Sequence, residues 1–279
     1  MKYFEANINQ LSSGMVAIVG VPSDENSSFL RGPAQASGQI RQVLHSGSSN
    51  LCAENGHDLG QEPRLLDVGD MPLGPGTWQA DGSPTIKGHI ASLLEKDVRV
   101  LSLGGDHAVT FPIVQAFAAK YPDLSILHID AHPDLYDTFE GSRVSHACPF
   151  ARIMEAKLAR RLVQVGIRTL NAHQKAQAEK FGVEIIQVAD WQPKVAINLS
   201  GPLYLSLDLD GLDPAFAPGV SHHEPGGLTT REVINLIQAI DVPVVGADIV
   251  ELNPVRDVVG MTTAVAAKLL KEIVVKLLT

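Results

Sequence analysis

The segment Asp130-Ala131-His132-Pro133-Asp134 carries metal-competent side chains at every second position. It follows the apolar run 124–129, which is typical of a buried strand, so the three side chains come just past a strand end and can converge on one point. Two carboxylates and an imidazole packed so closely would repel or lack partners unless a cation joined them, because unpaired buried charge is costly. A metal site is the first hypothesis, and a solvated acidic loop is the alternative.

Residues of the same kind follow three other apolar runs. His107 ends a Gly-Gly-Asp-His stretch, Asp208 and Asp210 follow a second run, and Glu251 follows a third. In open α/β sheets, ligands bind beyond the carboxyl ends of the strands. If these strands are neighbours, two imidazoles and the aspartates share one cavity at that edge.

The charge of the aspartates indicates how many ions this cavity would hold. Asp130, Asp134, Asp208 and Asp210 together carry about −4, which one divalent ion half compensates and two neutralise. We therefore infer a dinuclear site with at least one bridging carboxylate. Oxygen-rich ligation without a thiolate favours a hard ion such as Mn²⁺, while affinity alone would favour Zn²⁺, Ni²⁺ or Co²⁺. The identity of the metal stays open.

A pair of metal ions indicates a reaction class. Two ions lower the pKa of a bound water enough to supply hydroxide near neutral pH, which favours hydrolysis without a covalent intermediate on the enzyme. The sequence contains no serine-centred nucleophile elbow, and the Gly104-Gly105 pair lacks the pattern of a phosphate-binding loop.

The elements that must position these residues alternate along the chain. Apolar runs typical of buried strands are separated by stretches long enough for crossover helices, which predicts a mainly parallel sheet. The expected strands are 15–22, 64–70, 98–103, 124–129, 161–167, 183–188, 203–207 and 242–249. The expected helices are 33–44, 86–94, 109–120, 150–159, 172–181, 229–240 and 261–278. Without a linker between them, these elements predict a single three-layer α/β/α domain over residues 1–279.

The composition bounds the class of protein. Of 279 residues, 45% are hydrophobic, which is enough for a large core, and the net charge of −9 argues against nucleic-acid or anionic-membrane partners. The same charge suits a cationic substrate. Cys52 and Cys148 are too few for a disulfide framework, and neither segment 1–7 nor any other apolar run has the length of a signal peptide or membrane span. We therefore predict a cytoplasmic protein.

Taken together, the motifs resemble those of the ureohydrolase family, the arginases, agmatinases and their relatives. The matching segments, in the family's order and spacing, are Gly104-Gly105-Asp106-His107, Asp130-Ala131-His132-Pro133-Asp134 and residues 206–219. Further stretches are similar to plant-type arginases: 28–33, 137–141, 219–228 and 261–268. The resemblance implies an arginase/deacetylase-like fold and hydrolysis of a guanidino group.

The resemblance also implies a role for each residue of the site. One Mn²⁺ would be held by His107, Asp130, Asp134 and Asp208, and a second by Asp130, His132, Asp208 and Asp210. The bridging hydroxide would attack the guanidinium carbon, while Asp134 orients it and helps to move its proton to the departing amine. His146 matches the family's proton-shuttling histidine, and Glu251 matches the glutamate that pairs with the guanidinium.

The substrate predicted from the resemblance is arginine, cleaved to urea and ornithine, with agmatine, guanidinobutyrate or formiminoglutamate as alternatives. The loop after Asp134 lacks the Asn/Ser-rich stretch with which animal-type arginases grip the α-carboxylate and α-amino groups. Glu224 either contacts a substrate amine or only braces the turn at 225–227. Co²⁺, Ni²⁺, Zn²⁺ and Fe²⁺ stay open as metals, and the family suggests a homotrimer or homohexamer.

Two other function classes compete with this interpretation. A different dinuclear hydrolase, such as a phosphatase, would need cationic or neutral groups to grip its substrate where this chain offers Glu251. A non-catalytic binding protein would be expected to have lost ligands, yet all the family's ligand positions are filled. The remaining histidines are expected at the surface or in structural roles, His128 in particular packing away from the metals: His45, His57, His89, His128, His173, His222 and His223.

Overall fold

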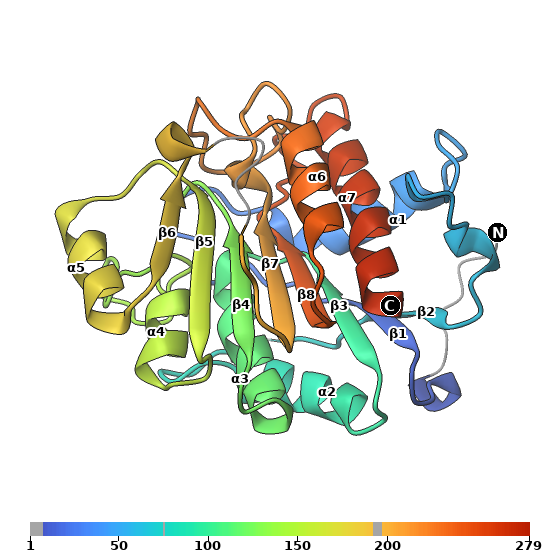
Figure 1. Cartoon of the computed structure of the whole chain (residues 1–279), viewed down its shortest axis with the longest axis horizontal. Coiled ribbons are helices and arrows are strands. Elements are labelled where there is room, and N and C mark those ends of the chain that lie inside the picture. Colours follow the sequence, from blue (N-terminus) through green and yellow to red (C-terminus); the bar gives the residue numbers. More distant parts are fainter. Residues whose placement is uncertain (1–7, 75, 192–196) are drawn as a thin grey trace.

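Parallel strands form the centre of the molecule (Figure 1). The computed structural model describes residues 8–74, 76–191 and 197–279, so segment 1–7, used in the signal-peptide argument, lies outside the described residues. The strands within the described ranges are β1 (Val16–Gly20), β2 (Leu65–Asp70), β3 (Arg99–Leu103), β4 (Ser125–Ile129), β5 (Arg161–Ile167), β6 (Glu184–Gln187), β7 (Leu203–Asp208) and β8 (Val244–Val250). They lie in the order β2-β1-β3-β8-β7-β4-β5-β6, and every neighbouring pair is parallel.

The central strands are buried on both faces, as their continuous apolar runs predict. Every residue of β4, β7 and β8 is buried, whereas the edge strands β2 and β6 are partly exposed. Leu127 and Ile129 of β4 belong to one hydrophobic cluster and Ile126 to another. Because successive residues of a strand point to opposite faces, the sheet needs a helical layer on each side.

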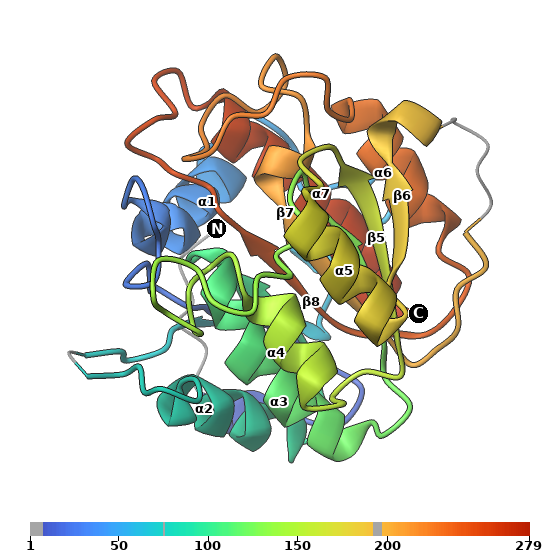
Figure 2. The ribbon, with the colours of Figure 1, turned by 90° about the vertical axis from the view of Figure 1, so that its left-hand side faces the viewer.

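Helices on both faces complete three layers (Figures 1 and 2). One layer contains α1 (Ala36–His45), α6 (Thr230–Ala239) and α7 (Met261–Leu278), and α7 packs between its two neighbours and against β8. The opposite layer contains α2 (Pro84–Leu94), α3 (Thr110–Lys120), α4 (Pro149–Glu155) and α5 (Ala172–Phe181). The predicted α/β class with a parallel central sheet is confirmed. No helix within the described ranges is long and apolar enough to cross a membrane.

Four predicted elements end earlier than expected, and two of them, the strand over 15–22 and the helix over 229–240, stop at Gly20 and Ala239. The helix expected over 150–159 stops at Glu155, after which the chain turns through Lys157 at a φ of 53°, outside the right-handed helical region. The strand expected over 183–188 stops at Gln187 and continues as a short 3-10 turn, Val188–Asp190. None of these differences moves a residue of the predicted site.

The four strands that carry the metal-competent residues are adjacent at the centre of the sheet, in the order β3-β8-β7-β4. The condition for a shared cavity is therefore met, since parallel strands end at one edge. The glycine pair after β3 shapes this edge. A Cβ on Gly105, whose φ is 91°, would lie 2.8 Å from Val109 Cγ1 and 2.8 Å from Val21 O, so only glycine fits where the chain delivers His107.

Candidate metal centre

His107 lies among three aspartates at the carboxyl edge of the sheet. Its Nδ1 is 3.1 Å from Asp130 Oδ2, 3.0 Å from Asp134 Oδ2 and 3.1 Å from Asp208 Oδ2. The His107 side chain is fully buried. These aspartates follow β4 and end β7, so the close approach is a product of the strand order.

His132 lies on the opposite side of the same group of aspartates, and we call the two histidines and these aspartates, with Asp210, the cluster. Its Nδ1 lies 3.1 Å from Asp210 Oδ2 and 3.4 Å from Asp130 Oδ1. Asp130 therefore contacts His107 through one carboxylate oxygen and His132 through the other. All six residues predicted as ligands meet here. Asp130, one of the two carboxylates expected to bridge, lies between the two imidazoles, and Asp208, the other, contacts His107.

The donor atoms fit a divalent cation. His107 Nδ1 is buried and has no hydrogen-bond partner within the described residues, although three carboxylate oxygens lie within 3.1 Å. Two ligand atoms bound at right angles and about 2.1 Å from one ion would lie about 3.0 Å apart, which is the spacing found. A ring nitrogen aimed between three oxygens, rather than at any of them, is the arrangement that an ion would complete.

The protein supplies too little positive charge to compensate the carboxyl groups of this cluster. Burial raises the pKa of Asp208 well above its usual value, and the neighbouring Asp210 and Asp130 raise it further. Burial likewise raises the pKa of Asp210 to about 6 and raises that of Asp134. Crowded buried carboxyls with raised pKa values are what a divalent cation would relieve.

The second nitrogen of His107 is held by a chain of buried polar groups that sequence reasoning missed. Ser206 Oγ donates to Asp248 Oδ1 at 2.7 Å, and His107 Nε2 lies 3.0 Å from the same Oγ. Because the hydroxyl proton goes to Asp248, Ser206 accepts from His107 Nε2–H, which leaves Nδ1 with its lone pair free for an ion. Asp248 Oδ2 also accepts from Thr110 and Tyr204, each at 2.8 Å. The available signal was a charged residue inside the apolar run of β8.

His128 corrects an expectation from the sequence. It is buried beside the cluster, with Nε2 2.8 Å from Asp130 Oδ2, and does not pack away from it. Gln164 Nε2 donates to His128 Nδ1 at 3.0 Å, so the proton of the neutral ring is on Nε2 and is donated to Asp130. Burial lowers the pKa of His128 to about 4, which keeps it neutral. The prediction was wrong because residues two apart on a strand share a face.

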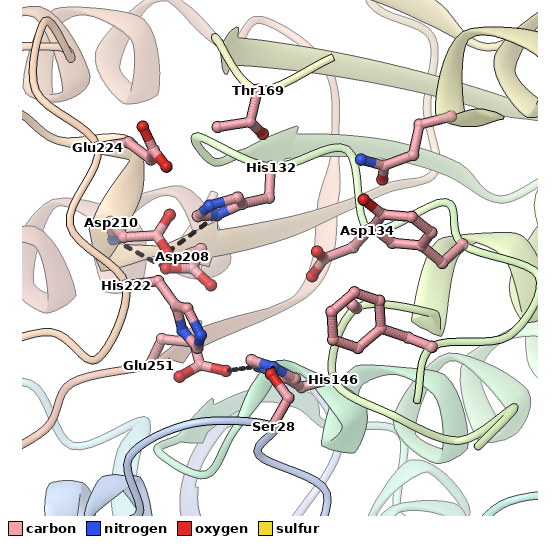
Figure 3. A pocket seen from close by; sticks show the side chains of 14 residues that line it. Ser28, His132, Asp134, His146, Thr169, Asp208, Asp210, His222, Glu224 and Glu251 are labelled. Atoms are coloured by element: carbon pink, nitrogen blue, oxygen red, sulfur yellow. Dashed lines mark hydrogen bonds and ion pairs between the residues drawn. The ribbon is translucent and has the colours of Figure 1, made fainter. Parts of the chain in front are cut away.

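A pocket of about 170 Å³ opens beside the His132 side of the cluster (Figure 3). Its lining includes His132, Asp134, Asp208 and Asp210, together with His146 and Glu251. Cys148 is not among its lining residues, and burial raises the pKa of that thiol to about 12, consistent with a packing role.

Glu251 and His146 form an ion pair on one wall of this pocket. His146 Nδ1 lies 2.9 Å from Glu251 Oε1, which also accepts from the His107 backbone N–H at 2.9 Å. Burial lowers the pKa of His146, but the charge and hydrogen bond of Glu251, together with the charges of Asp106 and Asp134, outweigh burial and raise the pKa to about 9. Glu251 Oε2 is buried without a hydrogen-bond partner among the described residues. One carboxylate oxygen is therefore left for a ligand.

Two residues of the 219–228 loop also line the pocket. His222, expected at the surface or in a structural role, places its ring 5.0 Å from that of His146. The Glu224 carboxylate has no hydrogen-bond partner within the described chain, and the turn at 225–227 is instead braced by Asp213 Oδ2, which accepts from Gly226 and Gly227. Glu224 is thus available to a ligand and is not needed for the turn.

Arg168 connects this loop to the aspartate and histidine cluster, and the sequence analysis did not identify it. Its guanidinium donates to the backbone carbonyl of Asp210 at 2.7 Å and to that of Glu224 at 2.8 Å. Further bonds reach the carbonyls of Gly211 and Leu212, both at 3.2 Å. Because these are backbone contacts, residue types alone gave no signal for them.

The chain is similar to proteins of one family. A model described as the Arginase family matches residues 15–275. "Arginase 1, mitochondrial" of Arabidopsis thaliana is 46% identical over 277 residues, covering 94% of this chain and 80% of the relative. The solved structure of arginase from Medicago truncatula superimposes with a TM-score of 0.88 at 40% identity, over 96% and 88% of the two chains. An agmatinase of Bacillus cereus is 35% identical, over 97% and 94%.

The names of these relatives overturn the predicted location. Three plant relatives that are 46%, 43% and 41% identical are named mitochondrial or chloroplastic/mitochondrial arginases. The cytoplasmic prediction is wrong because it rested on cysteine number and on the absence of long apolar runs. Neither feature carries information about targeting to an organelle, since transit segments are amphipathic and are recognised by receptors.

Proposed function

The chain belongs to the arginase family, and on that premise we propose that it hydrolyses the guanidino group of arginine to urea and ornithine. The observation that carries the proposal is the buried Oε2 of Glu251, which has no partner among the residues that the structure describes and lies in a pocket that also opens onto the aspartate and histidine cluster. A guanidinium is a planar cation whose N–H groups donate charge-assisted hydrogen bonds to a carboxylate oxygen. Glu251 would hold it beside the cluster.

The proposal includes two divalent ions, Mn²⁺ being preferred because the donors are mostly oxygens. His107, Asp130, Asp134 and Asp208 would hold one ion, and Asp130, His132, Asp208 and Asp210 the other. When bound, such a pair supplies a nucleophile from water near neutral pH and stabilises negative charge that develops during attack.

The residues of the chain would divide the remaining work. Asp134 faces both the cluster and the pocket, where its carboxylate would orient the attacking water and accept its proton. His146, whose pKa the neighbouring Glu251 raises against the effect of burial, would supply a proton for the departing amine. Glu224, free at the pocket wall, would bind the amino group at the other end of the substrate.

Agmatine is the second candidate substrate, on one specific observation. None of the described residues that line the pocket is a lysine or arginine, so no side-chain cation awaits the carboxylate by which arginine differs from agmatine. For arginine, neutral donors would have to bind that carboxylate. Thr169 and Gln174 lie in the lining and could do so.

Product analysis tests the proposed function. The Mn²⁺-loaded protein is incubated separately with arginine, agmatine and guanidinobutyrate, and urea and the amine product are quantified. We expect equal amounts of urea and ornithine from arginine, at a higher kcat/KM than for the other compounds. Absence of urea from arginine would overturn the proposal, and a higher kcat/KM for agmatine would establish the second candidate. The predicted homotrimer or homohexamer stays a prediction, which sedimentation equilibrium of the same preparation would check.

A further inference from the structure

Both ring nitrogens of His146 are already engaged by protein groups. Nδ1 lies 2.9 Å from Glu251 Oε1, and Nε2 lies 2.8 Å from Ser28 Oγ (Figure 3). An ionised carboxylate can only accept, so Nδ1 carries a proton that it donates to Glu251. Any proton that leaves the imidazolium for a ligand must therefore depart from Nε2, and the group that meets Nε2 is the hydroxyl of Ser28.

The loop that carries Ser28 is fixed from both sides. The backbone N–H of Asn26 donates to Asp106 Oδ2 at 2.9 Å, and the neighbouring Ser27 hydroxyl donates to the same oxygen at 3.2 Å. The backbone N–H of His146 donates to the Asn26 carbonyl at 3.1 Å. The loop is thus tied to the histidine's own backbone as well as to its ring, which holds the contact between Ser28 and His146.

Ser28 also faces the cavity in which the substrate would lie. It is one of the residues that line the pocket, on the same wall as His146 and Glu251, and its side chain is half-buried. Its hydroxyl therefore has access to His146 Nε2 and to the pocket at once. A hydroxyl suits this place because it can accept one proton while it donates another.

Building on the proposed function, we infer that Ser28 is the hydroxyl through which His146 delivers its proton to the departing amine. The Nε2–H bond of the imidazolium breaks as a new O–H bond forms on Ser28 Oγ. The original hydroxyl proton of Ser28 passes to the amine nitrogen as the C–N bond of the tetrahedral intermediate breaks. Ser28 ends unchanged and His146 ends neutral. Solvent water returns a proton to Nε2 by the reverse path.

Three variants test the relay, with kcat, KM and bound Mn²⁺ measured for each. Ser28→Ala removes the hydroxyl that contacts Nε2, and we expect kcat to fall by about 100-fold, the lower end of what a positioned general acid contributes. KM and bound Mn²⁺ should stay near the wild-type values, because neither Glu251 nor the cluster is altered. Ser28→Thr keeps the hydroxyl and should restore most of kcat.

Ser27→Ala is the matched control, since it removes an adjacent hydroxyl that contacts Asp106 and not His146. Ser27→Ala should retain the wild-type kcat. The loss of kcat in Ser28→Ala would then be caused by removal of the hydroxyl at Nε2 and not by a change in the loop. Wild-type kcat in Ser28→Ala would overturn the relay, as would equal losses in Ser28→Ala and Ser27→Ala or no recovery in Ser28→Thr. A wild-type protein that releases no urea from arginine contradicts the proposed function instead. The variants are then compared on whichever guanidino compound the wild-type protein hydrolyses. If it hydrolyses none of these compounds, both the relay and the proposed function are overturned.

Discussion

The two histidine sides of the aspartate and histidine cluster differ in how the protein holds them. On one side, His107 is fully buried and its Nε2 is fixed by Ser206 and Asp248, which belong to the sheet core. On the other side, His132 is 24% exposed and lines the pocket. A ligand fixed by buried neighbours is preorganised, whereas an exposed one can move and admit water. The contrast indicates a tight structural side and an open reactive side, joined by Asp130.

Asp130→Ala should have the largest effect, because this carboxylate contacts both sides. We expect loss of both ions and of measurable urea release, with His128 left without its acceptor. Metal content after gel filtration, together with the initial rate on arginine, checks the prediction. Retention of two equivalents of Mn²⁺ would show that Asp130 does not join the two sides.

His132→Ala should affect only the open side. Its removal leaves the contacts of His107 with Asp130, Asp134 and Asp208 in place. We expect about one equivalent of Mn²⁺ to remain bound while urea release falls by about 100-fold or more, since two ions act together on water. Loss of both ions in this variant would contradict the independence of the two sides.

Asp248→Asn should weaken the His107 side without touching a ligand. The amide at this position no longer fixes the Ser206 hydroxyl as a donor, so the orientation of His107 Nε2–H is lost. Loss of such outer partners typically costs about 10- to 100-fold in metal affinity. Mn²⁺ titration should show weaker binding only at the His107 side, where we expect the first and tighter of two binding steps. Tyr204→Phe, which removes one donor to Asp248 Oδ2, is the control and should change affinity less.

The smallest expected effect lies on the pocket wall, outside both sides of the cluster. His146 has a folded-state pKa of about 9, raised by Glu251 against the effect of burial. Its ion pair therefore contributes stability that is fully present below the ordinary histidine pKa of about 6.5 and is lost as pH rises through 9. In metal-free protein, Tm should fall by a few degrees over that range. His146→Ala should show a flatter profile, and an unchanged wild-type Tm would argue against the ion pair.

The ligands of both sides could be predicted from the sequence because each follows an apolar run that encodes a buried strand. The residues that hold these ligands in place could not be predicted from the sequence. Ser206 and Asp248 are partners only because β7 and β8 are adjacent in that register, and strand order is not a local property. Ser28 reaches His146 across 118 positions, which no spacing along the chain records. His128 could have been placed correctly by strand alternation.

Stepwise Mn²⁺ titration of the metal-free protein, with urea release from arginine followed at each step, tests the dinuclear account most directly. The structure predicts two equivalents per chain in two steps, the tighter one at the buried His107 side. Most of the activity should appear only with the second step. Full activity at one equivalent, or a single step that saturates there, would contradict the account.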